Sequence, residues 1–182
     1  MKKIAVHLAE GFEEIEAIGI IDVLRRADLD VKIVSMTGNL VVTGAHQVKI
    51  SADVLFEQVS YDKIDAIVLP GGMPGASNLN AHEGLKAQIT KFNQEKKQLA
   101  AICAAPLVYG NLGILKGKKA VCYPGFESQL NGAEILSVAA TESGNVITGR
   151  GPGAVFSFAL KIVERMVSVE KAEILAKQML VE

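Results

Sequence analysis

The sequence of 182 residues contains no tryptophan, two cysteines and only 5% aromatic residues. So few aromatic side chains argue against a base-stacking surface, and a formal net charge of -1 creates no field that attracts nucleic acid or acidic membranes. Two cysteines exclude a disulfide-rich secreted scaffold, and with three scattered histidines they do not suggest a structural zinc site. We expect no nucleic acid, membrane or metal partner.

Long apolar runs are also absent. No run approaches the ~18 residues of a membrane span, and the stretch after Met1-Lys2-Lys3 is broken by Glu10 without a signal-peptide pattern. The apolar fraction of 49% and the charged fraction of 21% are close to those of average soluble globular proteins. We expect a single domain over residues 1–182 that resides in the cytoplasm.

Short apolar runs alternate with helical patterns along the chain. The runs predict strands at residues 4–8, 31–35, 64–69, 99–102, 118–122 and 146–149, with a further candidate at 135–140. A first helix is predicted after the turn at residues 10–12, ending near residues 26–28, and further helices at 81–96, from 106, 154–166 and 169–179. A small antiparallel excursion is predicted at 38–50 and a loop at 73–80. This alternation predicts an α/β fold: a single-domain, doubly wound, mainly parallel sheet with helices on both faces.

Three unusual turns, at residues 10–16, 70–72 and 103–106, follow predicted strands. In doubly wound sheets, ligands bind beyond the carboxyl ends of the strands. We therefore expect the functional site where these three turns meet.

Cys103 is the most distinctive single residue. It ends a buried strand just before a helix opened by Pro106, where the partial positive charge of the helix is expected to lower the thiol pKa. Ala104 and Ala105 are small, as a tight strand-to-helix turn requires, although the glycines of the hydrolase nucleophile elbow are missing. An inert buried cysteine is the alternative, and the sequence context favours the nucleophile.

Glycines and glutamates occur in the other two turns. Gly71 and Gly72 allow the backbone to approach a ligand and to point N–H groups at a developing oxyanion; a plain strand-ending turn is the alternative. Glu13, Glu14 and Glu16 are favoured at a helix start by the helix dipole. At most one of the three should face Cys103, and spacing alone does not choose it.

The remaining reactive side chains are expected to be structural. Cys122 ends a predicted strand and is interpreted as a core residue. His7, His46 and His82 show no catalytic spacing to Cys103 and are interpreted as structural or solvent-exposed residues.

Together these segments resemble the ThiJ/PfpI superfamily, and within it the branch of the parkinsonism-associated protein deglycase. The resemblance covers essentially the whole chain, and the order and spacing of its motifs are highly specific. The motifs are AEGFEEIE at residues 9–16, VLPGG at 68–72, AAICAAP at 100–106 and GRGPG at 149–153. The resemblance implies the flavodoxin-like, class I glutamine amidotransferase-like form of the fold.

The resemblance also implies roles for particular residues. Cys103 corresponds to the nucleophile, Glu16 to the carboxyl group that hydrogen-bonds the thiol, and Gly72 to the oxyanion-side amide. The substrate contacts that we expect are Gly71, Ala104, Tyr123 and Arg150. Family members are typically homodimers, with the first helix at the interface in this branch.

This chain departs from the family pattern at two positions. Tyr123 occupies the place where many members carry a histidine near the cysteine, so Glu16 becomes the main acid/base candidate. Ala104 follows the nucleophile where peptidase-like relatives carry a histidine, and the downstream His–Glu pair of the glutamine amidotransferases is not found. Ala104 argues against proteolysis, and the missing His–Glu pair argues against glutamine hydrolysis.

The leading hypothesis is a cofactor-independent enzyme that acts on reactive carbonyls, as a glyoxalase or protein deglycase does. The Cys103 thiolate would add to an aldehyde such as methylglyoxal, Glu16 would move a proton between adjacent carbons, and the Gly72 amide would stabilise the oxyanion. A glycated amine or thiol would be the deglycase substrate. The alternative is a redox-responsive chaperone or oxidative-stress sensor without turnover, which needs the same cysteine.

Two further expectations concern assembly and oxidation. The apolar stripe of the first helix is assigned to Ile15, Ile18, Ile21 and Leu24; Ile20 and Val23 lie off it, and a homodimer would cover them. Mild peroxide should oxidise Cys103 before Cys122, because the first thiol is expected to be both acidic and accessible.

Overall fold

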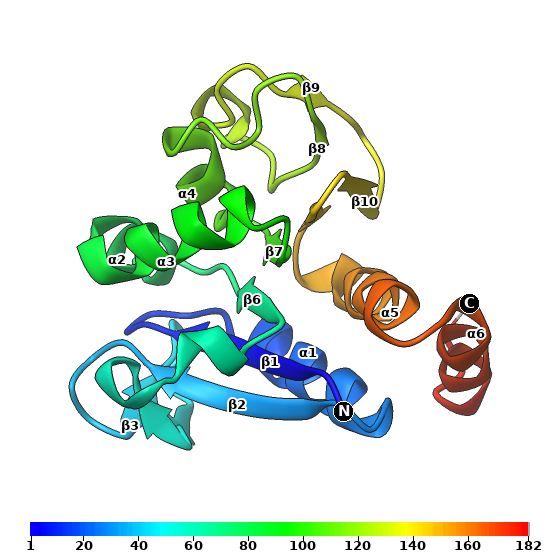
Figure 1. The fold of residues 1–182 in the computed structure, drawn as a ribbon, viewed down its shortest axis with the longest axis horizontal. Coiled ribbons are helices and arrows are strands. Elements are labelled where there is room, and N and C mark those ends of the chain that lie inside the picture. The colour runs from blue at the N-terminus through cyan, green and yellow to red at the C-terminus, as the bar shows by residue number, and fades with distance from the viewer. Residues whose placement is uncertain (182) are drawn as a thin grey trace.

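The computed structural model describes residues 1–181, and Glu182, the last residue of the predicted domain, lies outside them. A seven-stranded sheet crosses the centre of the molecule in the order β10-β11-β7-β6-β1-β2-β5 (Figure 1). Its strands are β1 (Lys3–Leu8), β2 (Asp30–Ser35), β5 (Val54–Leu55), β6 (Ala66–Leu69), β7 (Gln98–Ile102), β10 (Ala140–Ser143) and β11 (Val146–Gly149). Only the edge strand β10 pairs antiparallel, so the predicted mainly parallel sheet is confirmed.

Helices cover both faces of this sheet, as the prediction requires. On one side lie α1 (Glu14–Arg26), α5 (Val155–Met166) and α6 (Val169–Gln178), and on the other α2 (Gly75–Ala81), α3 (Glu83–Gln94) and α4 (Pro106–Asn111) (Figure 1). Short 3-10 turns occur at η1 (Phe56–Gln58), η2 (Tyr61–Lys63), η3 (Glu127–Gln129) and η4 (Pro152–Ala154). Within residues 1–181, no helix has the length and apolar character needed to cross a membrane.

Two small sheets lie outside the central one. β3 (Val41–Thr43) and β4 (Lys49–Ser51) form the predicted antiparallel excursion. β8 (Lys119–Ala120) pairs in parallel with β9 (Glu134–Ile135). The prediction of a strand over residues 118–122 was therefore too long, and the candidate at 135–140 was wrong. That segment is a connection between β9 and β10, which begins only at Ala140.

The predicted loop at residues 73–80 is also wrong, because α2 occupies most of it. Gly75, Ser77 and Asn78 are poor helix formers, so their sequence gives no helical signal. Tertiary packing overrides that propensity: Ala76 and Leu79 are fully buried, and α2 packs against α4.

The apolar face of α1 differs from the prediction. Ile20 and Val23 are fully buried, whereas Ile15 is 60% exposed and Ile18 is 48% exposed. Side chains spaced three residues apart are each rotated by about 60° from the previous one around the helix axis. Over the three steps from Ile15 to Leu24 the rotation adds up to about 180°, so these two side chains point in opposite directions. The buried face packs on α5, where a Cβ at Gly19 would lie 3.0 Å from Val155.

Candidate active site

Cys103 lies on the sharp turn between β7 and α4. Its φ of 64° is in the left-handed region, which costs energy for any residue other than glycine and is concentrated at functional sites. The Cys103 N–H donates to the Gly149 carbonyl at 2.9 Å, and the Cys103 carbonyl accepts from Tyr123 N–H at 2.9 Å. These bonds to β11 and to the segment after β8 hold the turn in its strained conformation.

The three glutamates at the start of α1 have separate roles. The Glu13 carboxylate caps the helix by accepting from Glu16 N–H at 2.7 Å. The Glu14 carboxylate accepts from the His46 N–H at 2.6 Å and contacts its ring nitrogen Nδ1 at 2.9 Å, which ties α1 to the β3–β4 hairpin. Glu16 is fully buried and is the glutamate that interacts with Cys103.

The Glu16 carboxyl group lies between Gly71 and Cys103. Its Oε2 accepts from Gly71 N–H at 2.7 Å, while Oε1 is buried without a hydrogen-bond partner among residues 1–181. A Cβ at Gly71 would lie 2.6 Å from the Cβ of Cys103 and 2.9 Å from Glu16 Oε2. Glycine is therefore required at residue 71 so that the carboxyl group and the thiol can meet.

Gly72 completes the contact between the turns. Its φ of +88° is unfavourable for a side chain, and a Cβ there would collide with the backbone of Glu13. The backbone N–H groups of Gly72 and Ala104 act on the Cys103 sulfur in the direction that lowers the thiol pKa. Two amides aimed at one atom can stabilise negative charge on sulfur or on a nearby oxygen.

Burial dominates the electrostatics of the thiol and carboxyl pair. It raises the pKa of Glu16 to about 7, against the opposing hydrogen bond from Gly71. Burial and then the charge of Glu16 raise the pKa of the Cys103 thiol to about 12. The predicted acidic thiol is therefore wrong for the resting pair, because α4 has only six residues and desolvation outweighs its dipole.

The predicted difference in accessibility between the cysteines is wrong as well. Cys103 is 7% exposed and Cys122 is 5% exposed. Burial raises the pKa of Cys122 to about 11, and the charge of Glu127 adds to that effect. The two thiols differ instead in their neighbours, since only Cys103 has a buried carboxyl group beside it.

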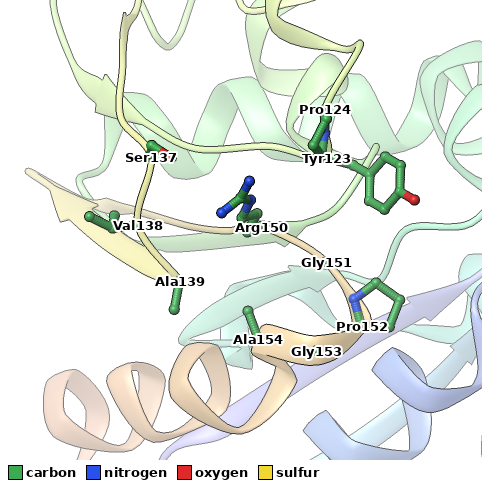
Figure 2. A pocket seen from close by; sticks show the side chains of 10 residues that line it. All are labelled: Tyr123, Pro124, Ser137, Val138, Ala139, Arg150, Gly151, Pro152, Gly153 and Ala154. Carbon is green, nitrogen blue, oxygen red and sulfur yellow. The ribbon is translucent and has the colours of Figure 1, made fainter.

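The other predicted substrate contacts lie next to this group. Tyr123 and Arg150 line a pocket of about 470 Å³, whereas Cys103, Glu16, Gly71 and Ala104 do not (Figure 2). Its floor is the turn from Gly151 to Ala154, and the Tyr123 ring lies over Gly151, where a Cβ would come within 3.0 Å of it.

Sequence reasoning missed part of this pocket. Ser137, Val138 and Ala139 form the wall that faces Arg150 (Figure 2). They follow β9 in an irregular segment whose composition carries no signal for a site. Tertiary contacts bring the segment here: Leu136 N–H donates to the Ala120 carbonyl at 2.8 Å, and Arg150 N–H donates to the Ala139 carbonyl at 2.9 Å.

The histidines occupy structural positions, as predicted. His7 is buried in β1 against the Tyr61 hydroxyl, with 2.8 Å between Nε2 and the oxygen, and desolvation lowers its pKa to about 4. His82 caps α3 by accepting from Leu85 N–H at 3.0 Å.

One group of side chains has metal-ligating character. Ligand atoms of Glu13, Glu14 and His46 lie within 4.8 Å of one another. Both carboxylates already accept hydrogen bonds from α1 or the hairpin, so the contacts explain the cluster as a structural joint.

These features place the chain among α/β proteins that present a cysteine on an elbow-like strand-to-helix turn. The chain belongs to the DJ-1/PfpI family, whose sequence profile matches residues 2–165.

Known proteins resemble the chain over nearly all of its length. It is 41% identical over 180 residues to Protein DJ-1 homolog B of Arabidopsis thaliana, covering 98% of this chain but only 41% of that protein. The solved structure of oxidized Toxoplasma gondii DJ-1 superimposes with a TM-score of 0.94 at 36% identity, covering 99% of this chain and 98% of that one. Deglycase PYRAB04690 of Pyrococcus abyssi is 27% identical over 164 residues, covering 89% of this chain and 98% of that protein.

Proposed function

We propose that this protein is a cofactor-independent enzyme that acts on small reactive carbonyl compounds through Cys103, as a glyoxalase or a protein deglycase does. The observation that carries the proposal is the buried Glu16 carboxyl group beside the thiol. Its raised pKa of about 7 suits a group that must take up and release protons at neutral pH. The deglycase from Pyrococcus abyssi supports the same chemical class.

Thiol and carboxyl act as a pair in the proposed reaction. When Glu16 takes the thiol proton, its negative charge disappears and its carboxyl group becomes a hydrogen-bond donor to sulfur. The carboxylate charge that disfavoured the thiolate is thus replaced by a hydrogen bond that stabilises it. The amides of Gly72 and Ala104 further stabilise that charge. The nucleophile is thus generated within the pair, without a histidine at residue 123.

The proposed reaction converts an α-oxoaldehyde into a hydroxy acid. Sulfur forms a bond to the aldehyde carbon, and the oxygen takes the proton from Glu16, giving a hemithioacetal. The Glu16 carboxylate then removes the hydrogen of that carbon as a proton and returns it to the neighbouring ketone carbon, while the hydroxyl proton of the hemithioacetal passes to the ketone oxygen, leaving the thioester of a hydroxy acid. Water cleaves the thioester, which releases the hydroxy acid and restores the thiol, so no external oxidant or reductant is consumed.

Substrate binding is assigned to residues around the thiol. We propose that Gly71 and Ala104 line the reacting carbon, with the Gly72 amide toward the oxyanion, and that Tyr123 and Arg150 hold the rest of the molecule. Cys103 and these two residues are linked through hydrogen bonds of the Cys103 backbone to Tyr123 and Gly149.

Turnover of methylglyoxal by the purified protein tests the proposal. We expect lactate formation that Cys103→Ala and Cys103→Ser abolish, while the matched control Cys122→Ser retains it. Release of the free amine or thiol from methylglyoxal adducts tests the deglycase version in the same preparations. Normal turnover by Cys103→Ala would exclude this mechanism.

A second candidate function is oxidation sensing or chaperone activity without turnover. The similar Toxoplasma gondii structure is of an oxidized DJ-1, which favours this alternative. Glu16 can accept the Cys103 proton, whereas Cys122 lies near the charge of Glu127. Peptide mass spectrometry after mild peroxide should show sulfinate at Cys103 first, and client protection without carbonyl turnover would support the sensor.

We also propose a cytoplasmic homodimer that covers the outer face of α1. Ile15 and Ile18, not Ile20 and Val23, are the exposed apolar residues there, and resemblance to the family supports the same interface. Light scattering should return twice the 19.3 kDa chain mass, and Ile18→Glu should shift the protein toward the monomer.

A further inference from the structure

The pocket beside the thiol has an unusual charge. Among the described residues that line it, Arg150 is the only charged one, and no carboxylate is present. Figure 2 shows the guanidinium pointing into the space between Ser137 and Pro124. A lone cation in a pocket with apolar walls and a serine hydroxyl is the arrangement that recognises an anionic group.

Arg150 also differs from every other arginine of the chain. Arg25, Arg26 and Arg165 each form an ion pair with a carboxylate, at 3.5, 2.7 and 3.4 Å respectively. Arg150 forms no ion pair with any residue in 1–181. Its guanidinium therefore keeps its five donors available to a ligand.

The start of α5 adds to the positive character of the pocket floor. The helix has twelve residues, and its N-cap Ala154 lines the pocket and has no side chain able to cap the first turn. The N–H groups of Ala154 and Val155 donate to the Gly151 and Pro152 carbonyls in the preceding 3-10 turn η4, so it is the dipole of α5, and not free N–H groups, that gives this end a partial positive charge. Helix end and guanidinium favour the same kind of ligand.

The pocket adjoins the nucleophile through the backbone. Arg150 directly follows Gly149, whose carbonyl accepts from Cys103 N–H, and Tyr123 donates its N–H to the Cys103 carbonyl, both at 2.9 Å. Two backbone hydrogen bonds therefore join the turn that carries the thiol to residues that line the pocket or directly precede them.

We propose that Arg150 makes the protein selective for carbonyl compounds that carry a carboxylate at the end remote from the reacting aldehyde. This inference rests on the proposed function for its catalytic consequence, but the binding of the carboxylate does not require turnover. Arg150 forms a bidentate contact with the carboxylate, and the Ser137 hydroxyl and the start of α5 stabilise the same charge.

The first experiment compares two substrates that differ only in charge. Dioxovalerate is an α-oxoaldehyde with a terminal carboxylate, and its methyl ester is neutral. We expect kcat/KM for the acid to exceed that for the ester by about tenfold. Arg150→Gln should remove this preference, Arg150→Lys should retain part of it, and Arg165→Gln, which removes a distant guanidinium, should preserve it.

The second experiment measures binding without chemistry. Levulinate has the ketone and carboxylate but no aldehyde, so it cannot form the hemithioacetal, and methyl levulinate is its neutral control. Titration followed by NMR should show that wild type and Arg165→Gln bind levulinate about tenfold more tightly than Arg150→Gln does.

The outcomes separate this inference from the proposed function. If both substrates are turned over without a preference, or if the preference survives in Arg150→Gln, the inference about Arg150 is overturned and the proposed enzymatic function remains supported. If neither substrate is turned over, the proposed function fails, and the titration decides the inference alone. Levulinate binding that depends on Arg150 then supports it, and no binding, or binding equal in Arg150→Gln, overturns it.

Discussion

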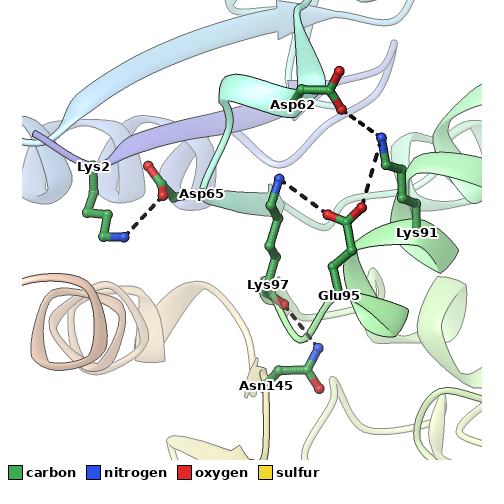
Figure 3. A network of polar contacts seen from close by, with 7 residues as sticks. All are labelled: Lys2, Asp62, Asp65, Lys91, Glu95, Lys97 and Asn145. Atoms are coloured by element: carbon green, nitrogen blue, oxygen red, sulfur yellow. Dashed lines mark hydrogen bonds and ion pairs between the residues drawn. The ribbon is translucent and has the colours of Figure 1, made fainter.

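The two ends of the central sheet use charged side chains in opposite ways. At the carboxyl ends of the strands, Glu16 is fully buried against Cys103, and one of its oxygens has no hydrogen-bond partner within residues 1–181. At the amino ends, a network of exposed charges joins the residues that precede several strands (Figure 3). At one end a fully buried carboxyl group forms no ion pair within residues 1–181, and at the other end the charged side chains are paired and partly exposed to solvent.

The network at the amino ends consists of partly exposed ion pairs. Lys2 Nζ lies 3.1 Å from Asp65 Oδ1, before β1 and β6, and Lys97 Nζ lies 3.4 Å from Glu95 Oε2, before β7. Asn145 Nδ2 donates to the Lys97 carbonyl at 3.0 Å, before β11. Such pairs are screened by water and salt and contribute little to stability.

The comparison shows how burial distinguishes a reactive charge from a solvated one. Each charged side chain of the network has an oppositely charged side chain nearby, and solvent stabilises the charge that the partner does not neutralise. Glu16 forms no ion pair with any cation in residues 1–181, and its burial raises its pKa into the neutral range, where proton transfer is efficient. A strongly perturbed carboxyl group beside a nucleophile is typical of an active site.

The largest effect is expected for the acid/base role of Glu16. Glu16→Gln keeps the acceptor for Gly71 but cannot exchange a proton, so kcat/KM for carbonyl turnover should fall by about a hundredfold or more. In wild type, kcat/KM should rise with pH and level off above pH 7, because the carboxylate form takes the thiol proton. A flat pH profile between pH 5 and 8 would contradict this role.

The next effect concerns stability. The folded pKa of Glu16 is about 7 and its ordinary value is 4.5, so the native state binds the extra proton between these values. Stability should therefore fall as pH rises from 4.5 to 7, by up to about 3 kcal/mol.

Glu16→Gln should remove this loss, so the variant should exceed wild type in unfolding free energy at pH 8 and match it near pH 4.5. Urea unfolding at both pH values measures the difference. His7, whose folded pKa is about 4, weakens both proteins equally as pH falls below 6.5, and therefore cancels in the comparison. Equal stabilities at pH 8 would mean that Glu16 is not destabilised by burial.

A smaller effect is expected from a side chain placed between the Glu16 carboxyl group and the Cys103 thiol. Gly71→Ala places a methyl group against Cys103 and Glu16, and should cost about 1–3 kcal/mol of unfolding free energy. Gly153→Ala is the matched control, since a Cβ there meets nothing within 4 Å. Thermal unfolding of both variants gives the comparison, and equal midpoints would show that the turns can move apart.

The smallest effect is expected at the amino ends. Asp62→Asn removes the nearer of the two carboxylate partners of Lys91, whose Nζ lies 2.7 Å from Asp62 Oδ1 and 4.0 Å from Glu95 Oε1. The unfolding midpoint should change by less than for Gly71→Ala, and added salt should reduce the change further. A loss as large as that of Gly71→Ala would show that the network is more than a solvated surface.

Local sequence determined the strands of the sheet and the approximate place of the site. The apolar runs now seen as β1, β2, β6, β7 and β11 are nearly continuous, which only strands buried on both faces require. The turns after β1, β6 and β7 had to meet, because parallel strands end at the same edge. Cys103 and Gly71 were accordingly expected to be neighbours, whereas Glu16 was selected among the three glutamates only by the family resemblance. The structure places all three together.

Only the tertiary structure decided what depends on burial and on distant partners. α2 forms from poor helix formers because α4 covers it, and the buried face of α1 includes Ile20 because α5 packs there. The roles of Glu13, Glu14 and Glu16 separate because each meets a different segment. The thiol pKa rises rather than falls, since desolvation depends on all the atoms around Cys103, whereas the sequence shows only the short helix that follows it.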